Sequence, residues 1–279
     1  MQMEREFPVI PEWLRTRQGV GAPARLRRFG SNRSDLEIDF AHGSLPAMVA
    51  RVLSLCSRSG DGRLVGEDTV FDLPVGLQLE AMLALAELSE TLPFTWRFRC
   101  AAAQCGSESE FELTVNELSA LADHSRKSET TEVGIDGYRL TLRRPTGRDQ
   151  LKWLEESTEP GPGAMLRQIL VSPSWDELER QGLRIEAIEA AVDEAMREFD
   201  PLPGFEMQVV CPECAMSSTV APALTVAALQ RLVGAQEGLL DDVHRIALHY
   251  HWTETQILSM PAWRRQEYLA RIEWMESSS

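Results

Sequence analysis

Hydrophobic residues recur at helical spacing in two segments of the first third of the chain. Residues 45–58 carry an apolar face at positions three and four residues apart, formed by Leu45, Met48, Val49, Val52, Leu53 and Leu55. Cys56 lies at the end of this predicted helix, where we expect it to be buried as a small hydrophobic side chain. A turn-rich stretch over residues 58–68 precedes a second predicted helix, which runs from about Gly76 to Leu88.

Alternation of polar and apolar residues predicts three β-hairpins. The first comprises residues 94–100 and 108–115, with two cysteines at its turn. The second covers residues 133–147 and turns at Asp136 and Gly137, a dipeptide typical of two-residue hairpin loops. The third lies within residues 205–223 and repeats the order of strand, cysteine-containing turn and strand.

The rest of the pattern is mainly helical. Residues 119–132 are polar and carry no predicted element. Helical periodicity then predicts helices over 148–156, 164–171 and 183–200, and the chain ends in predicted helices over 224–237, 239–252 and 253–275. The pattern as a whole predicts an α+β fold that ends in an all-helical module.

Charge divides the chain unevenly. The net charge is −15, but residues 1–34 hold seven arginines against three glutamates, a net +4 that leaves −19 for the remainder. We therefore expect a basic N-terminal arm over residues 1–34, an α+β body over 35–225 and a helical C-terminal module over 226–279. Such an acidic body lacks the broad basic face that neutralises phosphates, which argues against nucleic acid as a partner.

Four of the five cysteines form two close pairs that share a local sequence pattern. Each pair follows a Leu-Pro dipeptide, at Leu92 and Leu202, and a phenylalanine six residues before its first cysteine. Two such turns facing each other would supply the four thiolates of a tetrahedral zinc site. We therefore expect one structural zinc ion per chain, bound by Cys100, Cys105, Cys211 and Cys214. The fold is then a split pair of zinc-ribbon-like knuckles, with an α/β-hairpin insertion over about 120–200.

Two other interpretations of the cysteines stay open at this point. A Cys-x-x-Cys pair such as Cys211 and Cys214 also occurs in thioredoxin-type redox motifs. Those motifs lie at a strand-to-helix junction, however, whereas both flanks here are predicted strands. The second alternative is that the two pairs are unrelated sets of reduced cysteines.

The sequence contains none of the common catalytic motifs. The five histidines do not form a His-Glu-x-x-His motif, and there is no nucleophile elbow, phosphate loop or dinucleotide-binding glycine motif. A closed four-thiolate zinc site also has no open position for water. We therefore predict that the protein is not an enzyme and has no small-molecule substrate. No stretch approaches the ~20 apolar residues of a membrane span and the first residues lack a signal-peptide pattern, so we expect a cytoplasmic protein without a membrane partner.

Two segments resemble proteins that build contractile tails. Residues 70–77 (VFDLPVGL) and 137–156 (GYRLTLRRPTGRDQLKWLEE) are similar to the recurrent core of the T-even-type phage baseplate hub and tail assembly proteins. In that family a hairpin ending in Arg-Pro-x-Thr-Gly leads into an acidic helix. This chain has Arg-Pro-Thr-Gly at 144–147, followed by Arg148 and Asp149 where the family has Asp or Glu. Zinc-knuckle segments appear in some family members.

Residues 243–272 resemble a short module of tail assembly chaperones and of small proteins from contractile injection gene clusters. That module has a pattern like His-Trp-x-x-x-x-Ile-Leu followed by Arg-Arg-x-x-Tyr-Leu. The matching positions here are His251, Trp252, Ile257, Leu258, Arg264, Arg265, Tyr268 and Leu269.

The resemblance implies a non-enzymatic structural or assembly factor of a phage-like contractile tail or injection system. Its partners would be other tail or baseplate proteins, and the chain would be either cytoplasmic or incorporated in a phage-like particle. The expected partner-binding residues are His251, Trp252, Trp263, Arg264, Arg265 and Tyr268, although aromatic residues on helices also commonly pack a core. The alternative function is a zinc-ribbon adaptor or regulator that binds nucleic acid or a polymerase-like partner, which the acidic body disfavours.

Overall fold

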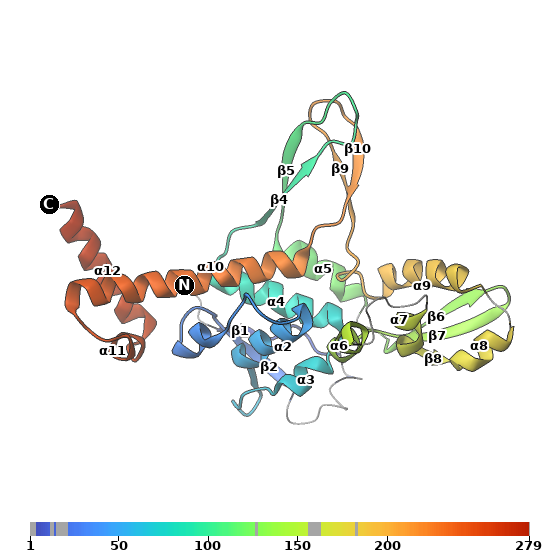
Figure 1. Cartoon of the computed structure of the whole chain (residues 1–279), viewed down its shortest axis with the longest axis horizontal. Helices are drawn as coiled ribbons and strands as arrows, with labels where there is room; N and C mark the ends of the chain where they lie inside the picture. The colour runs from blue at the N-terminus through green and yellow to red at the C-terminus, as the bar shows by residue number, and fades with distance from the viewer. Residues whose placement is uncertain are drawn as a thin grey trace.

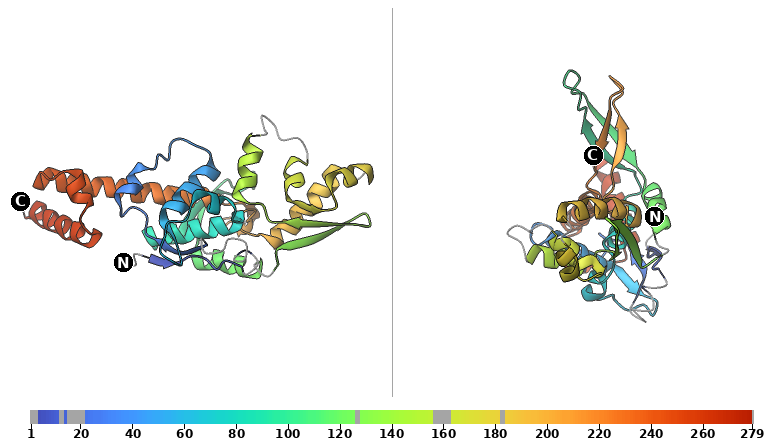
Figure 2. Two further views of the ribbon diagram at one scale, coloured as in Figure 1. Left: turned by 90° about the horizontal axis from the view of Figure 1, so that it is seen from below. Right: turned by 90° about the vertical axis from the view of Figure 1, so that its right-hand side faces the viewer.

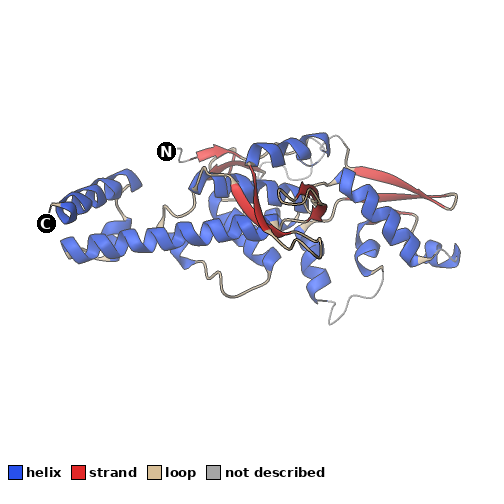
Figure 3. Ribbon diagram, turned by 90° about the horizontal axis from the view of Figure 1, so that it is seen from above, coloured by secondary structure: helices blue, strands red, loops and turns tan. Residues whose placement is uncertain are grey.

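The structure is a computed structural model that describes residues 4–11, 14, 22–125, 128–155, 163–181 and 184–278. The elements, in chain order, are β1 (Glu4–Glu6), β2 (Pro23–Arg27), η2 (Arg33–Glu37), α2 (Leu45–Cys56), β3 (Ser57–Ser59), α3 (Glu67–Phe71), α4 (Val75–Ser89), β4 (Phe94–Arg99), β5 (Glu108–Leu113), α5 (Val115–Ser125), β6 (Thr130–Ile135), β7 (Tyr138–Arg143), α6 (Gly147–Glu155), α7 (Ala164–Ile169), β8 (Leu170–Ser172), α8 (Trp175–Gln181), α9 (Ile185–Phe199), β9 (Met207–Val210), β10 (Ser217–Val220), α10 (Leu224–Tyr250), α11 (Glu254–Leu258) and α12 (Ala262–Ser277). Helices dominate, and the strands form small antiparallel sheets (Figures 1 and 3), which confirms the α+β class.

Helix α4 is the centre of the largest hydrophobic core. Its sequence, VGLQLEAMLALAELS, has apolar residues on every side, and 12 of its 15 residues are buried. A helix that is apolar all round must be covered all round. Helices α2, α5 and α10 pack against it, and the predicted burial of Cys56 on α2 is confirmed.

The N-terminal segment belongs to this core and is not a separate basic arm in its described residues. Strand β2 pairs with β1 on one edge and β3 on the other. Leu26 and Phe29 have no solvent exposure. Arg27 is buried because it forms a two-pronged ion pair with the fully buried Asp35, with its Nη1 atom 3.0 Å from Asp35 Oδ2. Residues 1–3, 12, 13 and 15–21 of the expected arm lie outside the described residues.

The segment between α5 and β9 has a core of its own. Strands β6, β7 and β8 form a sheet, with α9 packed against β6. Asp136 and Gly137 have φ values of 48° and 84°, as a two-residue hairpin loop requires, so the predicted turn is confirmed. Helix α5 occupies part of the polar stretch for which no element was predicted, because Leu118 and Ala122 give it a buried face.

Helix α10 joins the main core to the C-terminal helices. It is continuous over 27 residues, whereas the sequence pattern predicted two helices with a break at Gly238. Its first turns pack in the main core through Leu224, Ala228 and Leu232. Its last turns form a third core with α11 and α12, built from Val243, Ile246, Ile257, Leu269 and Ile272. The predicted C-terminal helical region is confirmed, but α10 crosses the expected boundary at residue 226.

Candidate metal centre

Two β-hairpins project side by side from the main core and together form what we call the finger. They are β4–β5 and β9–β10, and the predicted cysteine turns lie at their far ends (Figure 1 and the right-hand view of Figure 2). Alternation gives β4–β5 one aromatic face, in which Trp96 stacks between Phe94 and Phe111 at centroid distances of 5.7 and 5.8 Å. The opposite face is charged and exposed, with Arg97 2.7 Å from Glu110. The aromatic face therefore holds the finger on the main core and leaves its tip exposed.

The two cysteine turns have the same backbone closure although their cysteine spacing differs. The N–H of Cys100 donates to Ser107 O, and the N–H of Cys211 donates to Met216 O, both at 2.9 Å. The residue after each second cysteine is left-handed, with φ of 58° at both Gly106 and Ala215. The two extra residues in the first turn are therefore accommodated before its second cysteine, and the thiols of both turns converge on one cluster.

The four sulfur atoms lie at the spacing of a single tetrahedral metal site. Cys100 Sγ is 3.5 Å from Cys214 Sγ, Cys105 Sγ is 3.8 Å from Cys211 Sγ, and all four sulfur atoms lie within 4.8 Å of one another. Metal–sulfur bonds of about 2.3 Å in a tetrahedron place neighbouring sulfur atoms about 3.8 Å apart. A disulfide would need about 2.05 Å, and all five cysteines are free. The four cysteines therefore form a cluster that could bind one metal ion.

Burial and hydrogen bonds differ among the four thiols. Cys100 and Cys211 are buried, Cys105 is half-buried and Cys214 is exposed. Ser107 Oγ lies 3.2 Å from Cys211 Sγ and is the main cause that lowers the pKa of Cys211 to about 6. The backbone N–H of Met216 lowers the pKa of Cys214, but the hydrogen bonds of Cys214 to the other cysteines, with partial desolvation of its thiol, raise that pKa to about 12. Without a cation the four thiols cannot all ionise together, whereas a divalent ion would stabilise four thiolates at once.

The chemistry of this cluster is that of a closed site. Four thiolates complete a tetrahedron and leave no position for water or substrate. In the described ranges, no other group of three or more His, Cys, Asp or Glu side chains is placed to hold a metal ion. The sequence pattern identified the four cysteines, and Gly106 directly after Cys105 was a visible signal for the left-handed turn. The contact of Ser107 with Cys211 could not be predicted from the sequence, because serine is common in turns of every kind.

The predicted partner-binding residues divide into two groups. Trp252 packs against Tyr250 and Tyr268, each at a centroid distance of 4.9 Å, and this cluster adjoins the third core. Arg265 is 3% exposed and donates to Met260 O and Ser31 O, both at 2.7 Å. The structure therefore gives these side chains packing roles. The exposed members of the predicted set are His251, Trp263 and Arg264.

The two segments of the first resemblance lie in contact. The N–H of Val75 donates to Pro145 O at 2.9 Å, and the N–H of Gly147 donates to Leu73 O at 3.4 Å. Arg148 adds an ion pair to Asp72 at 2.8 Å. Residues 70–77 and 143–149, which are about 70 positions apart, thus form one junction between the main core and the insertion.

None of the helices in the described part of the chain has the length and hydropathy of a membrane span. Comparisons with protein-family models, with curated proteins and with solved structures gave no match to the chain.

Proposed function

We propose that this chain is a non-enzymatic scaffold protein in which one zinc ion joins the two hairpins of the finger. The observation that carries the proposal is the set of four sulfur atoms within 4.8 Å, contributed by turns more than 100 residues apart in sequence. Zinc suits an all-thiolate tetrahedron, and structural zinc sites contribute directly to folding. The sulfur spacing leaves room for a single ion, so a multi-iron cluster is not proposed.

The location of the cluster favours a structural role. The cysteines lie in the turns at the tip of the projecting finger, where Cys214 is exposed. Short hairpins have little core of their own, so a metal ion is a common means of holding them together. The ion would fix the distance and direction of one hairpin relative to the other. A protein built in this way presents a rigid shape to a partner.

The assembly that we propose is a phage-like contractile tail or injection system. This part of the proposal is supported by the resemblance of residues 70–77, 137–156 and 243–272 to tail assembly proteins. It is also supported by the hydrogen bonds that join the first two of these segments. The chain would act with other tail or baseplate proteins, either as a permanent subunit or as an assembly factor.

Metal analysis of the purified full-length chain tests the zinc proposal. We expect one zinc per chain, and we expect Cys214→Ser to reduce the zinc content sharply. Cys214 suits this test because its side chain is exposed, so the change removes a ligand with little loss of packing. Cys56→Ala is the matched control, because Cys56 is buried in the main core away from the finger and its loss should leave zinc bound. Full thermal stability without any bound metal would overturn the proposal.

A second experiment tests the assembly proposal separately. Mass spectrometry of purified contractile particles from the native host would find the chain if it is a permanent subunit. An assembly factor would be missing from the particles but would co-purify with tail proteins before assembly. If the chain is found in neither fraction, the contractile-tail proposal is wrong while the zinc proposal stands.

A further inference from the structure

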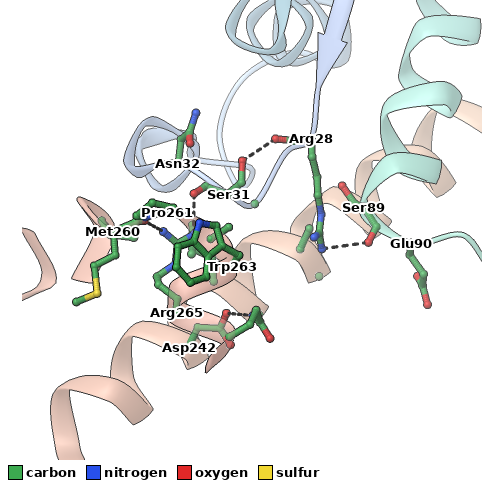
Figure 4. A pocket seen from close by; sticks show the side chains of 18 of the residues that line it. Arg28, Ser31, Asn32, Ser89, Glu90, Asp242, Met260, Pro261, Trp263 and Arg265 are labelled. Atoms are coloured by element: carbon green, nitrogen blue, oxygen red, sulfur yellow. Dashed lines mark hydrogen bonds between the residues drawn. The ribbon is translucent and has the colours of Figure 1, made fainter. Parts of the chain in front are cut away.

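A groove of about 1180 Å³ lies between the main core and the C-terminal helices. Its floor is the middle of α10, where Gly234 and Gly238 line it. Figure 4 shows Arg28 and Glu90 on one side of the groove and Met260 and Trp263 on the other. The hydrogen bond from Arg265 Nη2 to Ser31 O, 2.7 Å long and buried, ties the two sides together at the base. The groove is therefore a fixed feature of the fold.

The glycines on the floor are not explained by packing within the chain. A Cβ atom added at Gly234 or Gly238 would meet no heavy atom within 4 Å, so neither residue is there to let another element of this chain approach. Glycine in a helix interior is also less favourable than almost any other residue. Two glycines four positions apart on one helix face leave the backbone accessible to a closely packed ligand. The floor of the groove therefore has no side chains at these two positions, which leaves space for the backbone of a ligand.

One wall carries an apolar anchor. Trp263 is 69% exposed although it belongs to a helix whose opposite face is buried in the third core. Leu258 and Met260 line the groove beside it. Tryptophan is the side chain most enriched at the energetic centres of protein interfaces, because it buries a large area at a low entropic cost. A peptide in the groove would bury this indole.

The charges in the groove favour an acidic ligand. Arg28 and Arg265 form no close ion pair with a carboxylate among the described residues, although the charge of Asp242 acts on both, and Arg28 Nε is buried without a hydrogen-bond partner. Glu90 is already paired with Arg231 at 3.3 Å. Asp242 is the remaining carboxylate of the lining, and it accepts a hydrogen bond from Gln266 at 3.0 Å. The lining therefore holds three arginines (Arg28, Arg231 and Arg265) against two carboxylates, a net charge of +1 in a protein whose net charge is −15.

We propose that this groove binds a short segment of another protein that carries an acidic side chain beside apolar residues. The carboxylate would pair with Arg28, the apolar side chains would cover Trp263, and the backbone would lie on the glycine floor. From residue 230 to 242 the floor is about 18 Å long at 1.5 Å per helical residue, which matches about three helical turns or five to six extended residues. The proposal does not depend on the zinc ion or on the kind of assembly to which the chain belongs.

The test is selection from a displayed library of random 12-residue peptides against the full-length chain. We expect the enriched peptides to share an acidic residue within one helical turn of a bulky apolar residue. The dissociation constant of one synthetic peptide from this set is then measured by calorimetry at two salt concentrations. Binding should weaken as salt rises, because an ion pair at a partly exposed site is screened.

Substitutions with matched controls separate binding from folding. Gly238→Leu fills the groove and should weaken peptide binding at least about tenfold, while its melting temperature stays equal or rises because leucine is the better helix former. Glu237→Leu, which adds the same side chain at an exposed position outside the lining, should bind normally. Trp263→Ala should weaken binding by a similar factor, whereas Trp274→Ala, 70% exposed on the same helix, should not. Arg28→Gln should remove the salt dependence.

Several results would overturn the proposal. One is that no peptide is enriched, or that the enriched peptides are basic or uncharged. Another is that a selected peptide binds the Gly238→Leu variant as tightly as the unmodified chain. A third is that the chain forms a dimer that Gly238→Leu converts to a monomer, because the occupant would then be a second copy of this chain.

Discussion

Each cysteine turn contains one residue with a left-handed backbone, and substitutions at these two residues should change zinc affinity in opposite directions. Gly106 and Ala215 have the same φ of 58°, yet only one of them is glycine. A glycine tolerates this conformation at no steric cost, whereas a residue with a Cβ does not. We therefore expect Ala215→Gly to tighten zinc binding and Gly106→Ala to weaken it.

The magnitude follows from the backbone alone. A left-handed residue with a side chain costs about 1–2 kcal/mol, and the greater freedom of glycine in the unfolded chain offsets about 0.5–1 kcal/mol of that difference. The net effect is about 1 kcal/mol, or about a fivefold change in the dissociation constant. Steric contact adds little, because a Cβ at Gly106 would lie 3.7 Å from Arg99 Nη2, an ordinary contact distance.

The assay is competition for zinc between the full-length chain and a chromophoric chelator at fixed pH. In the proposed site the tip would fold around the metal, so backbone strain in the tip would appear directly in the zinc affinity. The double variant Gly106→Ala/Ala215→Gly should return to within about twofold of the unmodified chain, since the two turns are separate. If both single substitutions weaken zinc binding, the conformational reasoning is wrong and the side chain of Ala215 contributes a contact of its own.

Three further predictions concern the rest of the fold. Burial raises the pKa of Asp200 from an ordinary 3.8 to about 6, and the nearby charge of Arg144 only partly opposes this shift. The protonated carboxyl group therefore stabilises the folded chain. This contribution is complete below about pH 4 and is lost as the pH rises through 6. Asp200→Asn should thus remove up to roughly 3 kcal/mol of pH dependence from urea unfolding measured between pH 4 and 7.5, and an unchanged pH profile would contradict this. Asp149→Ala should lower the free energy of unfolding by roughly 3 kcal/mol in the same assay, because it strips Arg143 of two hydrogen bonds of 2.6 and 2.8 Å; a loss below about 1 kcal/mol would show that the pair is dispensable. Cys56 has no solvent exposure and lies in the main core, so in chelator a thiol reagent should reach the four cysteines at the tip of the finger first and Cys56 only after unfolding; five equally fast thiols in the folded chain would refute its burial.

Features that depend on local sequence could be predicted well. The repeated Leu-Pro and phenylalanine positions aligned the two cysteine turns, and the structure brings their four sulfur atoms together. The hairpin loop at Asp136 and Gly137 was predictable because few residues accept its backbone conformation. The apolar helix α4 was predictable as a helix, and its lack of a polar face is the signature of complete burial.

Features that depend on distant partners could not be predicted in this way. The arginines near the N-terminus predicted a solvent-exposed segment. Arg27 is nevertheless buried, because its charge is neutralised by Asp35, which lies eight positions further along the chain. Gly238 indicated a helix break, but packing of Leu232 and Leu239 on either side of it keeps α10 continuous. The exposure of an individual side chain on α12 was equally hidden, because Arg265 turns inward to Ser31 while Trp263, two positions earlier, turns outward.

The separation of the two cysteine turns also fixes when the finger can form during synthesis. Cys105 and Cys211 are 106 positions apart, so a ribosome adding about 5–20 residues per second exposes the first pair of thiols roughly 5–20 s before the second. Helix α4 must likewise wait for α10, whose Leu232 is made later still. For that interval the nascent chain carries two unpaired thiols and an apolar helix that lacks the cover of α10. In the proposed zinc site, capture of the metal is therefore a late event, close in time to closure of the main core.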